Sequence, residues 1–201
     1  LAICSAAAQA QAVIAAFNGG AHGGQAIAEL LFGKCNPSGR LPISFPRHSG
    51  QLPVYYNQLP GWHGENNVGK YCDLPAAPLY AFGEGLGYSA FGYQNLRMDA
   101  ETLTASVEVT NLGERQGLET VQIYFRDLVS SLLTPVKQLI AYEQVLLMPG
   151  ETKCLSFQLR KMNFSMVNRT GERVVEPGRF LLMAGHSSKD EDLLRCEFAL
   201  A

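Results

Sequence analysis

The chain lacks an excess of charge of either sign and a long uninterrupted apolar run. Its 201 residues hold 16 Lys and Arg against 18 Asp and Glu, which gives a formal net charge of −2. Proteins that bind nucleic acid or anionic membrane surfaces present a basic patch, so this balance disfavours both as partners. No segment approaches the roughly 20 consecutive apolar residues of a membrane-spanning helix, so we expect no membrane partner of that kind.

Closely spaced cysteines are also missing. The five cysteines are scattered along the chain, at Cys4, Cys35, Cys72, Cys154 and Cys196. None stands in the C-x-x-C spacing of zinc sites or redox motifs, and no histidine has a partner at ligand spacing, so we expect no metal. The glycines of residues 19–24 and 33–35 do not match a dinucleotide or phosphate loop, so we expect no cofactor. Unpaired thiols slightly favour a reducing cytoplasm, with a periplasmic or secreted location left open.

Glycine and proline, in contrast, are well represented in residues 26–46, where they mark the boundaries between a helix, a turn and an extended segment. Residues 26–32 are apolar at helical spacing, and Gly33 follows where a residue of positive φ can cap a helix. Residues 36–39, Asn-Pro-Ser-Gly, have the composition of a tight turn. The two prolines after them exclude a helix and predict an extended exit.

Residues 1–46 as a whole predict a helix and a strand, then a turn, a second helix and the extended exit. This is a βα fragment without a complete sheet, and it cannot bury both of its faces alone. We therefore expect the incomplete end of a domain whose earlier part is absent, with residues 1–46 ordered only by contact with other structure.

Residues 47–96 are rich in Gly, Pro, Asn and Tyr and show little periodicity, which predicts a long linker. We expect five aromatic side chains to anchor this linker to the neighbouring domains, namely Tyr55, Tyr56, Tyr71, Tyr80 and Phe82.

Period-two patterning begins after residue 96. Leu103, Ala105, Val107 and Val109 alternate with polar residues, as in a half-buried strand. Further strand-like runs follow at residues 120–126, 136–147, 152–159, 164–168, 172–175, 179–185 and 193–200. About seven short strands separated by turn signals indicate a β-sandwich over residues 97–201, the one autonomous domain we expect here. The fold class is therefore mostly β.

Four stretches carry a family resemblance. They read GAHGGQAIAE (residues 20–29), LLFGKCNPSGRLPISFP (30–46), QLPVYYN (51–57) and PLYAFGEGLGYSAF (78–91). In order and spacing they resemble glycoside hydrolase family 3, the β-glucosidase and β-xylosidase group, although the family usually has proline near Gly19 and glutamate near His22. The resemblance implies the end of an α/β-sandwich domain, a linker and a fibronectin type III-like domain. It also implies a whole enzyme that releases a terminal β-linked sugar with retention through a covalent glycosyl intermediate.

Catalysis requires two carboxyl groups about 5–9.5 Å apart. By resemblance, the nucleophilic aspartate belongs to an N-terminal (β/α)8 barrel, in cis or on a separate chain, and the acid/base glutamate lies on an earlier part of the sandwich domain or on another loop. Neither motif occurs here. Glu65, Asp73 and Glu84 are the carboxylates near the family-like stretches, and a solvated loop or a turn accounts for each. We therefore expect no catalytic residue in this chain.

Trp62 and His63, with Glu65 beside them, are the candidate substrate-binding residues. Sugars stack their C–H faces on aromatic rings, and a glycine-flanked loop can carry such rings to the rim of an active site. The competing interpretation is that Trp62 packs onto the sandwich and His63 is solvated.

Two other functions stay open at this stage. A non-catalytic β-sandwich module for carbohydrate binding or adhesion has no need of the βα fragment at residues 1–46. A structural subunit of a split hydrolase differs only in whether the barrel belongs to a separate chain. The residues do not distinguish glucosidases from xylosidases or fix the oligomeric state.

Overall fold

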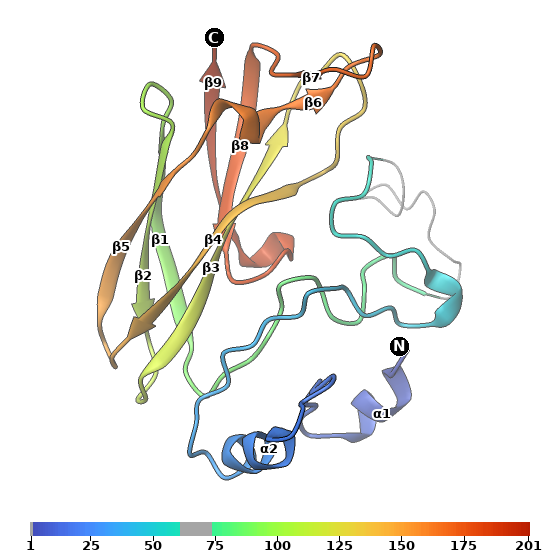
Figure 1. The fold of residues 1–201 in the computed structure, drawn as a ribbon, viewed down its shortest axis with the longest axis vertical. Helices are drawn as coiled ribbons and strands as arrows, with labels where there is room; N and C mark the ends of the chain where they lie inside the picture. Colours follow the sequence, from blue (N-terminus) through green and yellow to red (C-terminus); the bar gives the residue numbers. More distant parts are fainter. Residues whose placement is uncertain (1, 61–73) are drawn as a thin grey trace.

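Alternating apolar residues build two antiparallel sheets that face each other in the computed structural model, which describes residues 2–60 and 74–201 (Figure 1). In β2 (Thr104–Asn111) the inward Ala105, Val107 and Val109 are fully buried, as the alternation predicts. β2 lies at the centre of the three-stranded sheet, between β1 (Phe91–Asp99) and β5 (Thr152–Gln158). The four-stranded sheet has the order β4 (Gln138–Leu147), β3 (Gly117–Asp127), β8 (Gly178–Gly185) and β9 (Leu193–Leu200).

Aromatic rings fill the sandwich core at one end. Phe164, at the end of the short 3-10 helix η2 (Lys161–Phe164), lies 5.4 Å from Phe125 and 5.3 Å from Phe198, ring centre to ring centre. Such pairs contribute about 0.5–1.5 kcal/mol each beyond the area they bury. A two-stranded ribbon, β6 (Met166–Val167) and β7 (Arg173–Val174), follows η2.

β3 is buried on both of its faces. Val121, Ile123 and Phe125 point into the core, whereas Gln122 and Tyr124 point outward and are buried as well. The linker covers them, because Tyr56 stacks on Phe82 at 4.2 Å and meets Tyr124 edge-on at 5.9 Å. The four-stranded sheet therefore has the core on one side and the linker on the other.

The expected aromatic anchors divide into three groups. Tyr56 and Phe82 anchor the linker as predicted, and Tyr80 packs edge-on against Phe45 at 6.3 Å. The prediction is wrong for Tyr55, which is 62% exposed. Tyr71 lies outside the described residues.

The sandwich begins earlier than its strand pattern indicated. β1 starts at Phe91 and so crosses the boundary expected between residues 96 and 97. Phe91 and Tyr93 pack against the core, and a bulge between Gln94 and Arg97, with Asn95 at φ 57°, breaks the strict alternation. This interruption explains why the sequence pattern does not reveal β1.

The N-terminal part contains α1 (Cys4–Gln9) and α2 (Gly23–Leu31), which lie beside the sandwich in Figure 1. The strand expected after the first helix does not form: residues 10–22 include no strand, and Val13 and Ile14 are exposed. A strand needs a hydrogen-bonding neighbour, and the described residues offer none at this position. In residues 2–60 and 74–201 no helix is long and apolar enough to cross a membrane.

α2 ends as its glycine predicts. Gly33 has φ 69°, and the Lys34 amide donates to the Glu29 carbonyl at 2.8 Å in a Schellman-type cap. The tight turn expected at residues 36–39 is wrong, because none of these residues lies in a turn or a bend. The Asn36 side chain, which could have closed a local turn, instead accepts from the Tyr88 amide and donates to the Gln116 carbonyl.

Candidate functional site

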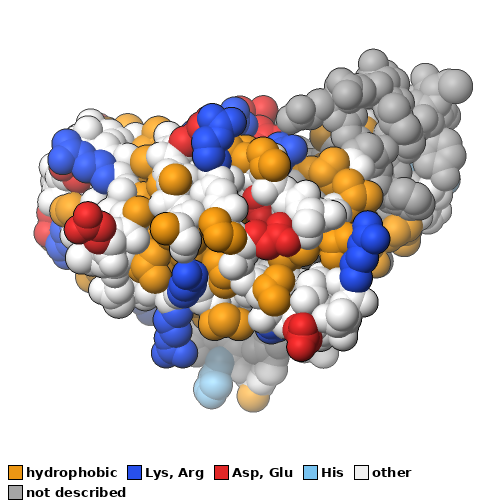
Figure 2. Space-filling model, turned by 90° about the horizontal axis from the view of Figure 1, so that it is seen from above, with side chains coloured by type: hydrophobic (Ala, Val, Ile, Leu, Met, Phe, Trp, Pro, Cys, Tyr) orange, Lys and Arg blue, Asp and Glu red, His pale blue; other side chains and the backbone are white. Residues whose placement is uncertain are grey.

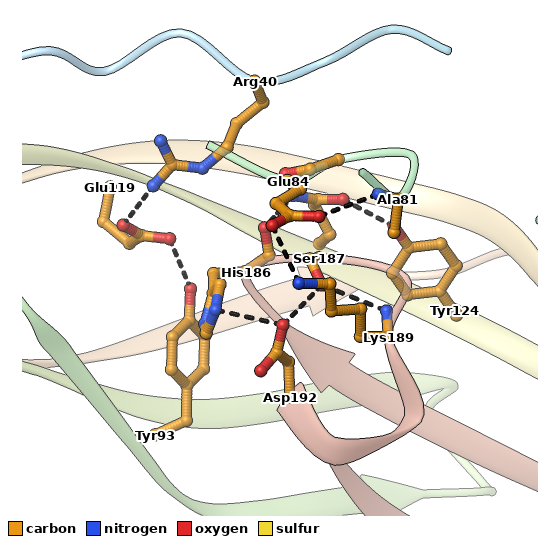
Figure 3. Close-up of polar contacts among 12 residues, drawn as sticks. Arg40, Ala81, Glu84, Tyr93, Glu119, Tyr124, His186, Ser187, Lys189 and Asp192 are labelled. Carbon is orange, nitrogen blue, oxygen red and sulfur yellow. Dashed lines mark hydrogen bonds and ion pairs between the residues drawn. The ribbon is translucent and has the colours of Figure 1, made fainter. Parts of the chain in front are cut away.

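The residues that the sequence nominates for substrate binding, Trp62, His63 and Glu65, lie outside the described residues, as does Asp73. Glu84 is the one nominated carboxylate that the structure describes. One of its oxygens accepts from the Ala81 amide at 2.7 Å and the other pairs with the Lys189 ammonium at 2.7 Å (Figure 3). Both oxygens of Glu84 are thus used to close a turn and bind the sandwich, which is a structural role.

A buried ion pair stands beside this turn. Arg40 Nη2 lies 2.6 Å from Glu119 Oε2, and the Tyr93 hydroxyl donates to Glu119 Oε1 at 2.7 Å (Figure 3). The Glu119 side chain is only 1% exposed. Arg40 comes from the N-terminal segment and Glu119 from β3, so the pair joins the two parts. Among the described residues, Arg40 Nε is buried without a hydrogen-bond partner.

Burial sets the protonation behaviour of this pair. It raises the pKa of Glu119 above the usual glutamate value of 4.5, against the lowering effects of Arg40 and the Tyr93 hydroxyl. Burial, followed by the nearby Glu119 charge, raises the pKa of Tyr93 well above its usual value. The tyrosine hydroxyl therefore stays protonated and donates a hydrogen bond to the Glu119 carboxylate.

A serine, a histidine and an aspartate also meet in the loop between β8 and β9. The Ser187 hydroxyl donates to Asp192 Oδ2 at 2.6 Å, and His186 Nε2 lies 3.2 Å from the same oxygen (Figure 3). A nucleophilic serine needs its hydroxyl against the histidine base, not against the acid. This set therefore holds the loop in shape and does not activate Ser187.

The loop between β8 and β9 is also hydrogen-bonded to the linker, directly and through Gln122 of β3. Gln122 Nε2 donates to the Gly83 carbonyl at 3.1 Å and to the His186 carbonyl at 2.6 Å, and the Ser188 amide donates to the Phe82 carbonyl at 3.0 Å. Gly83 has φ 77°, and a Cβ placed there would lie 2.0 Å from Gln122 Oε1. Glycine is thus required at this contact for conformation and for space.

A second contact fixes the end of α2. Arg115 Nη1 donates to the Gly33 carbonyl at 3.0 Å, and the Tyr88 hydroxyl donates to the Leu30 carbonyl at 2.5 Å. Arg115 also lies over the Tyr88 ring, 5.7 Å from its centre. Cations and donors at a helix C-terminus satisfy its free carbonyls and its dipole.

We call these two groups together, around Arg40–Glu119 and around Arg115, the polar joint. Arg40 pairs with Glu119, and Arg115 donates to a backbone carbonyl, so these charged groups position segments and are not a free acid or base. Within the described part of the chain, no cluster of three or more His, Cys, Asp and Glu could hold a metal ion. The described residues that line a groove of about 410 Å³ at one end of the sandwich include a single acidic side chain, Glu101, whereas glycoside hydrolysis needs two.

The exposed surface supports the same view. Figure 2 looks onto the molecule from the top of Figure 1, where basic, acidic and apolar side chains are interspersed. The described side chains of this face form no extended field of one sign.

Sequence reasoning missed Glu119 and Gln122. The available signal was their position, because a charged side chain and an amide stand within the apolar strand 117–127. A polar residue in a strand buried on both faces has to be hydrogen-bonded, which marks it as a contact to another segment.

Two family comparisons cover most of the chain. Residues 2–88 match the glycosyl hydrolase family 3 C-terminal domain, and residues 119–188 match the fibronectin type III-like domain. The chain belongs to glycoside hydrolase family 3. The contact of Gly83 with Gln122 and the ion pair Arg40–Glu119 therefore join the two regions that match these family models.

Individual proteins with similar sequences or structures are consistent with this family assignment. The periplasmic β-glucosidase of Salmonella typhimurium is 41% identical over 90% of this chain, and a β-xylosidase of Formosa agariphila is 40% identical over 90%. A solved β-glucosidase of Listeria innocua in complex with glucose superposes on 99% of the chain with a TM-score of 0.89 and 36% identity. The chain covers 25%, 26% and 29% of these three proteins, respectively, and thus spans about a quarter of their length.

Proposed function

We propose that the protein to which this chain belongs is an exo-acting retaining β-glycosidase that removes a terminal β-linked glucose or xylose. The observation that carries this proposal is the 40–41% identity, over 90% of the chain, to proteins named β-glucosidase and β-xylosidase. The reaction of such an enzyme passes through a covalent glycosyl intermediate.

In this proposal the catalytic carboxylates lie outside this chain, on a (β/α)8 barrel in cis or on a separate chain. Residues 1–46 form the end of an α/β-sandwich domain, and residues 47–90 lead into the fibronectin type III-like sandwich, whose first strand starts at Phe91. The exposed apolar side chains of residues 2–32, Phe17, Leu31 and Phe32 among them, support the presence of further structure against this part.

Trp62, His63 and Glu65 are proposed to contact the sugar at the rim of the active site. The chemistry that supports this role is the apolar face of a pyranose, which stacks on an indole ring, and its hydroxyl groups, which hydrogen-bond to imidazole and carboxylate.

A non-catalytic module for carbohydrate binding or adhesion is not favoured. Such a module would need the sandwich alone, whereas the match to the family 3 C-terminal domain takes in residues 2–88.

The test is hydrolysis of nitrophenyl β-glucoside and nitrophenyl β-xyloside by the purified 201-residue chain and by the full-length protein. We expect turnover by the full-length protein and none by the chain, because a single carboxylate without its partner across the sugar leaves water attack uncatalysed. Glu65→Gln in both proteins is the matched variant. Turnover by the isolated chain that disappears with Glu65→Gln would place a catalytic carboxylate here and contradict the proposal.

A further inference from the structure

The loop between β3 and β4 lies outside the polar joint and presents apolar side chains to solvent. It comprises residues 128–137 and passes the linker before it enters β4 (Figure 1). Val129 is 69% exposed in this loop, and Leu133 is 74% exposed. Single exposed aliphatic side chains are common on protein surfaces. These two, however, stand four positions apart in a loop whose backbone is held firmly.

Hydrogen bonds fix this loop to the rest of the sandwich. The Leu128 amide donates to the Arg179 carbonyl of β8 at 3.1 Å. The Ser131 amide and the Ser131 hydroxyl donate to the two carboxylate oxygens of Glu176 at 2.9 and 2.5 Å, respectively. A loop that is already held in one conformation loses little freedom when a partner covers it, which favours binding.

The polar side chains of the loop are used within it. The Ser130 hydroxyl donates to the Leu132 carbonyl and lies 3.4 Å from the Thr134 hydroxyl. The apolar Val129 and Leu133 are the side chains that face outward. A loop that stays in water has the opposite pattern, with its polar side chains toward the solvent. The arrangement therefore fits a loop that is covered in a larger structure.

The linker runs beside the end of this loop. The Val136 amide donates to the Gln58 carbonyl at 2.9 Å, and the Leu139 amide donates to the Tyr56 hydroxyl at 3.4 Å. Leu59, the residue after Gln58, is 46% exposed and adds a third aliphatic side chain to this area. The linker belongs to the region that matches the family 3 C-terminal domain, so the loop lies where the two matched regions meet.

We propose that Val129 and Leu133, with Leu59 beside them, form a docking surface for the N-terminal part of the intact protein, which lies outside this chain. The proposal rests on the proposed function, in which that part carries the catalytic carboxylates. The chain spans about a quarter of the length of its relatives, so a protein of that size has the larger part of its length available to cover this surface. The three side chains carry no charge, and the surface that meets them is therefore apolar.

The first test is hydroxyl-radical footprinting of the full-length protein, which modifies side chains that solvent reaches. Leu133 should react about fivefold more slowly than in the urea-unfolded protein, because a residue at the centre of an interface is buried. Met148, which follows the far end of β4 and is 53% exposed, is the control. It should react at close to its rate in the unfolded protein.

The second test replaces the same side chains in the full-length protein. Leu133→Asp should lower the melting temperature by about 3 °C, because it sets a charge against an apolar surface. Leu133→Met keeps an apolar side chain of similar volume and should melt with the parent. Met148→Asp is the matched control and should also melt with the parent, since an exposed position tolerates a charge.

The outcomes separate this proposal from the proposed function. A fully reactive Leu133 in an active full-length enzyme overturns the docking surface and leaves the proposed function intact. A protected Leu133 in a full-length protein that hydrolyses neither nitrophenyl glycoside supports the docking surface and contradicts the proposed function.

Two further results concern the occupant of the surface. Protection that fades on dilution, with Leu133→Asp converting a dimer to a monomer in light scattering, assigns the surface to a second copy and overturns the proposal. Protection that is equally strong in the isolated 201-residue chain overturns it as well, because the covering residues then belong to this chain.

Discussion

Residues 2–46 and residues 91–200 both carry many apolar side chains, but the two regions bury them to very different extents. In the sandwich, Val107, Ile123 and Phe180 are fully enclosed by two sheets of the same chain. In residues 2–46, no residue of α1 and only Gly23 of α2 is buried, and Phe32 is 88% exposed. Apolar content alone therefore does not decide whether a segment has a core, because a segment also needs a second layer to face.

The difference shows what holds each part. The sandwich depends on apolar burial, which stabilises by about 25 cal/mol per Å² removed from water. Apart from the buried Phe45, residues 2–46 are attached mainly through directional polar contacts, such as Arg40 with Glu119 and Arg115 with the Gly33 carbonyl. Losing one group in the first part creates a cavity, whereas losing one in the second leaves a charge or a carbonyl without its partner.

The largest expected effect contrasts two phenylalanines. Phe180→Ala should lower the free energy of unfolding by about 3–5 kcal/mol, because Phe180 is fully buried among other aromatic rings. Phe32→Ala should change it by less than about 0.5 kcal/mol, since its ring is exposed in this chain. Urea unfolding of both variants measures the difference. Equal costs would show that residues 2–46 have a core of their own.

The next effect tests the ion pair. Arg40→Met should cost about 3 kcal/mol, because it leaves the Glu119 carboxylate buried without its cation. The double variant Arg40→Met with Glu119→Leu should recover most of that loss, since an apolar pair replaces the ionic pair. Thermal unfolding of the single and double variants completes the cycle; a double variant as unstable as the single one would argue against the pair.

The same variant has a pH dependence of defined sign. Burial already raises the pKa of Glu119, and removal of Arg40 takes away a lowering influence. A carboxyl whose pKa is higher in the folded state binds its proton more tightly there, so the folded state gains stability as the pH falls toward the usual glutamate pKa of 4.5. The deficit of Arg40→Met should therefore shrink on acidification.

The smallest effect concerns Asp190 within the sandwich. Although partial burial raises the pKa of Asp190, Lys137 at 2.7 Å and then Arg195 bring it below the usual aspartate value of 3.8. A lowered pKa contributes stability that is present above pH 3.8 and is lost as the pH falls through the folded-state value. The Asp190 side chain is 58% exposed, so the contribution is below about 1 kcal/mol.

Lys137→Met is the variant that tests this effect, with Arg195→Met as the milder control, since Arg195 lies 3.2 Å from Asp190. The difference in unfolding free energy between the parent and Lys137→Met should be largest above pH 3.8 and should shrink as the pH falls below that value. Superimposable curves of this free energy against pH would show that solvent screens the pair completely.

Much of the sandwich was predictable because its strands follow local rules. The alternation at residues 105–109 gives β2 directly, and the runs at 179–185 and 193–200 coincide with β8 and β9. The resemblance to family 3, which the family comparisons confirm, came from glycines and prolines whose backbone constraints are equally local.

The features that the sequence did not predict depend on contacts between segments far apart in the chain. Asn36 does not form a local turn because its side-chain amide bonds to the backbone of Tyr88 and Gln116. Gln51 is buried and donates to the carbonyls of residues 75–77. No window of sequence around either residue contains those partners. The assignment of Trp62, His63 and Glu65 to substrate binding stays a prediction.

Because β3 is buried on both faces, the sandwich strands alone are not a suitable fragment for domain exchange. A gene fragment that starts at Phe91 encodes every strand of the two main sheets, yet it lacks Tyr56 and Phe82, which lie against Tyr124. Transplanted into another scaffold, that fragment would carry a bare patch around Tyr124 and Gln122 on its outer wall. A transplanted sandwich therefore needs the linker residues that cover β3, and a domain exchange has to include them.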